Sequence, residues 1–184
     1  MSEVSVFLAD GFEEIEGLTV VDLMRRAGID VEMVSIMEKK KIMGSHKIVV
    51  KADVKFEKAD FSDTKMLVLP GGLTGTENLK AHKGLRELLL KFHEEGKHLA
   101  AICAAPTILA GLGLLEGKRA TCYPSMEEEL AGAKAVGEAA VTDGTVTTGR
   151  GMGASIAFAL QLVALLRDQE TADALAEKIV YQIK

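Results

Sequence analysis

The sequence of 184 residues has no tryptophan, only three prolines and only two cysteines. Cys103 and Cys122 cannot form the disulfide framework that stabilises small secreted domains, so a reducing cytoplasm is the expected location. No apolar run approaches the length of a membrane span, and Met1–Glu3 leads directly into an expected strand, so neither a membrane anchor nor a signal peptide is predicted. A formal net charge of −5 offers no basic surface, so nucleic acid is not an expected partner.

The composition that remains is that of a soluble globular protein. Hydrophobic residues make up 48% of the chain and charged residues 27%, which is ordinary for such proteins. The length predicts one domain over residues 1–184, because a chain of this size buries a full hydrophobic core. With only six phenylalanines and no tryptophan, we expect a core of aliphatic side chains.

Strand and helix patterns alternate along the chain. Short apolar runs predict strands, and helical spacing of apolar residues predicts helices between them. Alternation of this kind predicts an α/β fold with a doubly wound, mostly parallel sheet and helices on both faces. The expected strands are 4–9, 29–36, 66–69, 99–102 and 119–123, the expected helices are 13–27, 83–95, 104–112, 126–130 (capped by Ser125), 154–167 and 171–183, and hairpins are expected at 40–50 and 139–148.

Several residues with chemical potential follow the predicted strands. Asp10, Pro70–Gly72 and Cys103 each stand where a strand ends. Ligands of open α/β sheets bind at the carboxyl ends of the strands. The sequence therefore predicts a functional site at this edge of the sheet.

Cys103 is the strongest candidate in that site. It lies at a strand-to-helix junction, among the small residues that a tight elbow requires. The positive end of the following helix is expected to lower the pKa of the thiol, and the thiolate is the reactive form. The alternative is a packed core cysteine without reactivity.

Gly71 and Gly72 are the second feature. Their N–H groups, with that of Ala104, are candidates to face a developing oxyanion. The alternative is a tight turn that needs positive φ. The segment Gly71–Gly75 lacks the glycine spacing of a dinucleotide fingerprint.

Three glutamates begin the first predicted helix. Glu13 and Glu14 are expected on a solvated face that complements the helix dipole. Glu16 stands between apolar residues and is expected to turn inward, where burial and a nearby thiolate raise its pKa, so that it stays protonated and hydrogen-bonds the sulfur. The histidines, including His46, show no metal-ligand spacing, so no metal site is predicted.

Three motifs together resemble the ThiJ/PfpI superfamily, in the branch that contains the parkinsonism-associated protein deglycase. They are Gly11–Glu16 (GFEEIE), Val68–Gly72 (VLPGG) and Ala101–Pro106 (AICAAP). The likeness continues through Val21–Gly28 and Thr148–Gly151.

The resemblance implies a flavodoxin-like, class I glutamine amidotransferase-like domain and a homodimer with its active sites near the subunit interface. It also implies that Cys103 is a readily oxidised elbow nucleophile, that Glu16 is its protonated partner, and that Gly71, Gly72 and Ala104 line an oxyanion pocket. The implied activity is a cofactor-independent, stress-protective glyoxalase or deglycase, acting on small dicarbonyls or on glycated side chains. A cysteine-oxidation sensor or redox-regulated chaperone without turnover is the alternative.

The sequence departs from the family pattern at two positions. Tyr123 stands where the deglycase has a histidine near the cysteine, and Ala104 stands where the peptidases have one. The absence of a Cys–His dyad argues against peptidase or amidase chemistry. A peripheral contribution from His46 or Tyr123 stays open.

Overall fold

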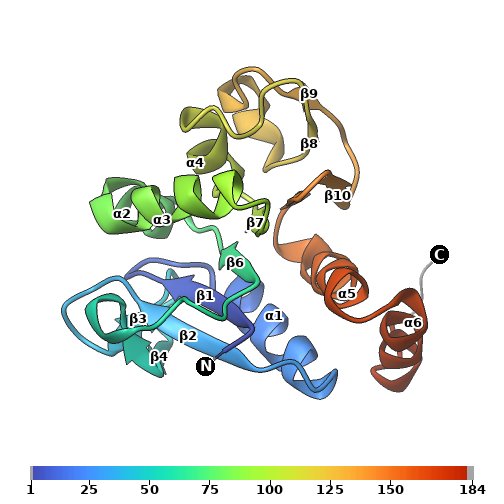
Figure 1. Ribbon diagram of the computed structural model, residues 1–184, viewed down its shortest axis with the longest axis horizontal. Helices are drawn as coiled ribbons and strands as arrows, with labels where there is room; N and C mark the ends of the chain where they lie inside the picture. The colour runs from blue at the N-terminus through green and yellow to red at the C-terminus, as the bar shows by residue number, and fades with distance from the viewer. Residues whose placement is uncertain (1, 182–184) are drawn as a thin grey trace.

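A seven-stranded sheet forms the centre of the computed structural model, which describes residues 2–181 (Figure 1). The strand order is β10-β11-β7-β6-β1-β2-β5, and every neighbouring pair is parallel except β10 and β11. This arrangement confirms the predicted doubly wound, mostly parallel sheet. The strands are β1 Val4–Leu8, β2 Val31–Ser35, β5 Val54–Lys55, β6 Met66–Leu69, β7 His98–Ile102, β10 Ala140–Asp143 and β11 Val146–Gly149.

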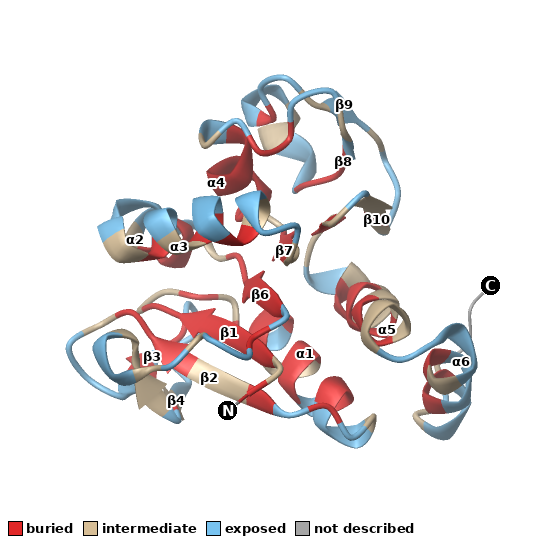
Figure 2. Cartoon of the chain, viewed as in Figure 1, coloured by how far each residue is buried: buried red, intermediate tan, exposed pale blue. Residues whose placement is uncertain are grey.

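Helices cover both faces of the sheet. The helices α1 (Glu14–Arg26), α5 (Ser155–Leu166) and α6 (Gln169–Lys178) pack on one face, and α2 (Leu73–Ala81), α3 (Lys83–Glu94) and α4 (Pro106–Gly111) pack on the other. The burial of the strands is nearly continuous, as Figure 2 shows for β1 and β6. Strands covered on both faces must be apolar on both.

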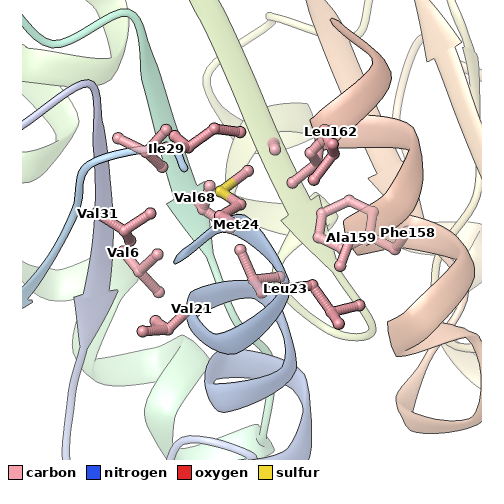
Figure 3. Close-up of a cluster of buried hydrophobic side chains, with 14 of the residues drawn as sticks. Val6, Val21, Leu23, Met24, Ile29, Val31, Val68, Phe158, Ala159 and Leu162 are labelled. Atoms are coloured by element: carbon pink, nitrogen blue, oxygen red, sulfur yellow. The ribbon is translucent and has the colours of Figure 1, made fainter. Parts of the chain in front are cut away.

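The side chains of β1 divide between two cores. Val6 and Leu8 belong to the cluster beneath α1 and α5, whereas Phe7 belongs to the cluster beneath α2, α3 and α4. Alternation of side chains along a strand produces this division. Figure 3 shows part of the first cluster, with Met24 of α1 and Phe158 of α5 among the strand residues.

Both predicted hairpins are confirmed. The strands β3 (Lys41–Met43) and β4 (Val49–Lys51) pair antiparallel outside the main sheet, and β10 pairs antiparallel with β11 across the turn at Gly144. Gly28 has a φ of +69° directly after the last residues of α1, as expected for a helix C-terminus. None of the helices within residues 2–181 is long and apolar enough to cross a bilayer.

Four expectations differ from the structure. Helix α2 is not predicted from the sequence, because Gly75 and the polar residues around it obscure the apolar side of the helix. The strand expected at 119–123 is shorter, because β8 covers only Arg119–Ala120 and pairs with β9 (Lys134–Ala135). The N–H of Tyr123 donates to the Cys103 carbonyl.

The helix expected at 126–130 is a 3₁₀ helix over Pro124–Glu129, preceded by Tyr123 rather than capped by Ser125. Helix α6 ends at Lys178, earlier than expected, and positions 182–183 of the expected helix lie outside the described residues. Two further short 3₁₀ helices cover Phe56–Lys58 and Met152–Ala154.

Candidate active site

The carboxyl ends of three neighbouring strands meet at one edge of the sheet. Asp10 follows β1, Pro70 and Gly71 follow β6, and Cys103 follows β7. The order β7-β6-β1 makes these three strands adjacent. The predicted convergence of the strand ends is therefore present in the structure.

Cys103 occupies a strained backbone conformation. Its φ is +65°, in the left-handed region that non-glycine residues seldom adopt. Its N–H donates to the carbonyl of Gly149 and its own carbonyl accepts from the N–H of Tyr123, both at 2.9 Å. Such a conformation costs about 1–3 kcal/mol and recurs at active sites, where the surrounding structure holds it in place. The sharp turn points the half-buried sulfur away from the sheet and into a cavity.

Glu16 lies on the first turn of α1 and is buried, with 1% of its surface exposed. Its Oε2 accepts a hydrogen bond of 2.9 Å from the N–H of Gly71. Its Oε1 is buried and has no N–H or O–H partner among the described residues. The carboxyl also interacts with the thiol of Cys103. The unpartnered oxygen is the one best suited to carry a proton, because a buried carboxylate oxygen without a donor is strongly disfavoured.

Burial dominates the ionisation of this pair. Burial raises the pKa of Glu16 to about 7, and the negative charge of Glu13 acts in the same direction. Burial and the neighbouring Glu16 carboxylate raise the pKa of the Cys103 thiol to about 12. Between about pH 7 and about pH 12 the pair therefore holds one proton and one negative charge, and below pH 7 both groups are protonated.

The direction of the thiol pKa corrects the sequence-based expectation. The dipole of the following helix was expected to lower it, but α4 has only six residues and its effect is smaller than those of burial and of Glu16. The N–H groups of Gly72 and Ala104 do interact with the sulfur and oppose the increase. The raised pKa of Glu16 agrees with the expectation.

The two glycines serve different purposes. A Cβ on Gly71 would lie 2.6 Å from Oε2 of Glu16 and 2.7 Å from Cβ of Cys103, so the pair requires a glycine between its members. Gly72 has a φ of +87°, and a Cβ there would lie 2.4 Å from the carbonyl oxygen of Gly11. The N–H of Gly71, expected to face an oxyanion, donates to Glu16 instead. Only Gly72 and Ala104 direct N–H groups at the sulfur.

The sulfur opens into a cavity of about 440 Å³. Both peripheral candidates, His46 and Tyr123, line this cavity with Cys103. The side chain of His46 is 70% exposed, and Tyr123 is 50% exposed and also lines a neighbouring depression. The other lining residues are Gly11, Glu13, Ser45, Gly72, Leu73, Thr74, Ala104, Ser125 and Met126.

Glu14 holds the hairpin turn beside the cavity, a structural role that the sequence did not reveal. It was expected on a solvated face, yet its side chain is only 3% exposed. Its carboxylate accepts hydrogen bonds from the N–H groups of His46 (2.8 Å) and Ile48 (3.3 Å) and from Ser45 Oγ (3.1 Å). Burial opposes the charge, but hydrogen bonds from its own N–H, from the N–H groups of His46 and Ile48 and from the His46 side chain lower the pKa of Glu14. The hairpin turn is thereby held against the cavity. No local pattern indicates this contact, because the partners are more than thirty residues apart.

The same contact brings together residues that were not expected to share a site. Ligand atoms of Glu13, Glu14 and His46 lie within 4.8 Å of one another. Their positions in the sequence do not have the spacing of metal ligands. Ser45 Oγ lies 3.1 Å from the carboxylates of Glu13 and Glu14 and 2.9 Å from His46 Nδ1. Hydrogen bonding within the turn accounts for the cluster.

Comparison with known protein families gives a match along most of the chain. The model of the DJ-1/PfpI family matches residues 2–165. Protein DJ-1 homolog B of Arabidopsis thaliana is 38% identical over 92% of this chain, and protein dj-1beta of Drosophila melanogaster is 33% identical over 95% of both chains. A protein named as a deglycase from Pyrococcus abyssi is 32% identical, over 89% of this chain and 99% of its own. The chain spans only 39% and 44% of the length of the two Arabidopsis relatives.

Solved structures share the fold over the whole chain. A cysteine-to-alanine mutant of a DJ-1 superfamily protein from Salmonella typhimurium superposes with a TM-score of 0.94 at 33% identity, with both chains covered completely. An oxidised DJ-1 from Toxoplasma gondii superposes with a TM-score of 0.95 at 29% identity and the same coverage.

Proposed function

The chain belongs to the DJ-1/PfpI family, and on this premise we propose that it is a glyoxalase or deglycase with Cys103 as its nucleophile. The substrates are reactive dicarbonyls or the early adducts that they form on amines and thiols. The observation that carries the proposal is the contact between the buried Glu16 carboxyl and the half-buried Cys103 thiol, which lines a cavity and can exchange a proton with Glu16. A relative named as a deglycase supports the same class of reaction.

The pair supplies both groups that the first step needs. The Cys103 sulfur attacks the aldehyde carbon, and the carbonyl oxygen takes up a proton, which gives a hemithioacetal. The Glu16 carboxylate takes up the proton of the thiol as the sulfur attacks, and it is placed to deliver that proton to the oxygen. The N–H groups of Gly72 and Ala104 stabilise the negative charge on the oxygen during attack.

The remaining steps need no external oxidant. The carbon-bound proton of the hemithioacetal moves to the neighbouring carbonyl carbon through an enediol, and Glu16 carries this proton. The adduct becomes a thioester of a hydroxy acid. Water then hydrolyses the thioester and restores the thiol, so that the net change is addition of one water to the dicarbonyl.

Consumption of methylglyoxal by the wild type and by Cys103→Ser tests this mechanism. The serine variant keeps the shape of the site but loses the nucleophilic sulfur, so we expect activity to fall to background. Metal-free buffers exclude adventitious catalysis. Undiminished turnover by Cys103→Ser would sink the mechanism.

A second candidate function is an oxidation sensor without turnover. A solved relative is an oxidised DJ-1, and the same Glu16 carboxyl and N–H groups could stabilise a sulfinate on Cys103. Intact mass after mild peroxide treatment tests this function. A Cys103 that stays a thiol while methionines gain oxygen would contradict it.

We also propose that the functional unit is a homodimer formed through α1 and the β3–β4 hairpin. Ile15, Ile48 and Val49 are 50%, 55% and 55% exposed, and Ile15 and Ile48 line an open apolar depression with Leu18 and Ile156. Exposed apolar patches of this kind mark protein interfaces. Sedimentation of the wild type and of Ile48→Lys tests the proposal: a dimer is expected for the first and a monomer for the second, and a monomeric wild type refutes it.

A further inference from the structure

Glu13 lines the Cys103 cavity, and a hydrogen bond holds its backbone in place. It is the residue preceding α1, and its N–H donates to the carbonyl of Gly71 at 3.0 Å. Its side chain is 15% exposed and lines the same cavity as the sulfur. A compound bound in this cavity next to Cys103 therefore also lies near Glu13.

The charge of Glu13 has no permanent counterion. Its side-chain partners are Ser45 Oγ at 3.1 Å and His46 Nδ1 at 3.6 Å, and no lysine or arginine within residues 2–181 pairs with it. The residues that line the cavity include no lysine or arginine. Glu13 also raises the pKa of Glu16, so its field extends to the reacting pair. No lysine or arginine of the described residues therefore offsets the Glu13 carboxylate in this cavity.

We propose that Glu13 is a specificity-determining residue that makes the Cys103 cavity favour cationic and neutral compounds over anionic ones. For the reaction, which rests on the proposed function, the favoured substrates are dicarbonyls and adducts that carry no carboxylate near the reacting carbon. The cavity, at about 440 Å³, lies in the range of sites that hold drug-sized ligands. It has room for a substituent beyond a three-carbon dicarbonyl.

Thiol-modifying reagents of opposite charge test the proposal without any assumption about catalysis. Two methanethiosulfonates of similar size are used, one with an ethyltrimethylammonium group and one with an ethylsulfonate group. The rate of modification of Cys103 is measured for each reagent. Cys122 is fully buried, so it is not expected to react, and peptide mass confirms that Cys103 is the modified residue. The informative quantity is the ratio of the cationic rate to the anionic rate.

Glu13→Gln is the test variant, and Glu77→Gln is the matched control. Glu77 is an exposed residue of α2 outside the cavity, so the control removes the same charge at a distance. We expect Glu13→Gln to lower the cationic-to-anionic ratio by on the order of five-fold, and Glu77→Gln to leave it within a factor of about two. An unchanged ratio in Glu13→Gln, or an equal change in both variants, overturns the proposal.

The wild type provides a second measurement should Glu13→Gln fold poorly. Raising the ionic strength from about 20 mM to about 500 mM shortens the screening length several-fold, so the wild-type ratio should approach that of a small neutral thiol. A ratio that salt leaves unchanged contradicts the proposal.

Turnover then separates this proposal from the proposed function. Phenylglyoxal is compared with its 4-carboxy and 4-trimethylammonio derivatives, and the carboxylate is expected to gain in kcat/KM in Glu13→Gln relative to the other two. If the wild type consumes none of the three, the glyoxalase proposal fails, and the thiol-modification ratios still decide the role of Glu13.

Discussion

Glu14 and Glu16 stand on the first turn of the same helix, both carboxyls are buried, and their pKa values move in opposite directions. Glu14 faces the turn of the β3–β4 hairpin, where two backbone N–H groups and a hydroxyl donate to its carboxylate. Glu16 faces the ends of β6 and β7, where one N–H donates to Oε2 and none to Oε1.

The difference shows that burial alone does not fix the charge of a carboxyl. Burial raises the pKa of both residues, and the number of donors decides whether this increase is overcome. The several donors around Glu14 keep it ionised, and its carboxylate stabilises the hairpin. The lack of donors around Glu16 lets it hold a proton next to the Cys103 thiol, as general acid–base catalysis requires.

The largest expected effect is on the pH dependence of stability through Glu16. Its folded-state pKa of about 7 lies above the value of 4.5 for a glutamate in the unfolded chain, so its stabilising contribution is full below pH 4.5 and is lost as the pH rises through 7. The loss amounts to about 3 kcal/mol. Glu16→Gln cannot ionise, so urea denaturation under reducing conditions should show a flatter dependence between pH 5 and pH 8.5. An equal decline in wild type and variant would refute this assignment.

Glu14→Gln should have the opposite signature. The pKa of Glu14 is lowered by its hydrogen bonds although burial opposes them, so the stabilisation is present above the unfolded pKa and is lost as the pH falls through the folded pKa. Removing the charge should cost about 2 kcal/mol at pH 7 and less at acidic pH. Urea denaturation at pH 7 and pH 4 measures both. A variant that is destabilised more at pH 4 than at pH 7 would show that the hairpin contact does not depend on charge.

The sequence predicted most of the structure around Glu16. The strand-to-helix elbow at Cys103, the glycines after β6 and the inward turn of Glu16 are encoded in short local patterns. The sheet order follows from alternating strands and helices, whose connections have few possible arrangements.

The sequence could not predict the surroundings of Glu14. The donors to Glu14 come from a hairpin more than thirty residues away, and nothing local distinguishes Glu14 from a solvated glutamate. The prediction of a lowered pKa for Cys103 was wrong for a related reason. The pKa depends on burial and on the neighbouring Glu16, which only the tertiary structure brings next to the sulfur. The sequence did not predict helix α2, because tertiary packing rather than a regular spacing of apolar residues stabilises it.

A smaller effect is expected from the strained backbone beside Glu16. Cys103 has a φ of +65°, which glycine adopts at no steric cost. Cys103→Gly should therefore be more stable than Cys103→Ala by about 1 kcal/mol, although glycine is the more flexible residue in the unfolded chain. Both variants lack the thiol, so the comparison isolates the backbone. Thermal denaturation measures the difference, and a less stable glycine variant would show that the elbow is not strained.

The smallest effect extends the comparison to a group whose neutral form accepts the hydrogen bond. His82 precedes α3, and its Nδ1 accepts from the N–H of Leu85 at 3.0 Å. Burial lowers the pKa of His82, while the charge of Glu57 opposes this shift. The stabilisation is therefore present above pH 6.5 and is lost as the pH falls through the folded pKa, where protonated Nδ1 can no longer accept. His82→Asn keeps an N-cap acceptor without the titration, so its stability should change less between pH 7.5 and pH 5.5 than that of the wild type, by up to about 1 kcal/mol. Thermal denaturation at the two pH values measures the difference, and identical shifts would show that the imidazole does not cap the helix through Nδ1.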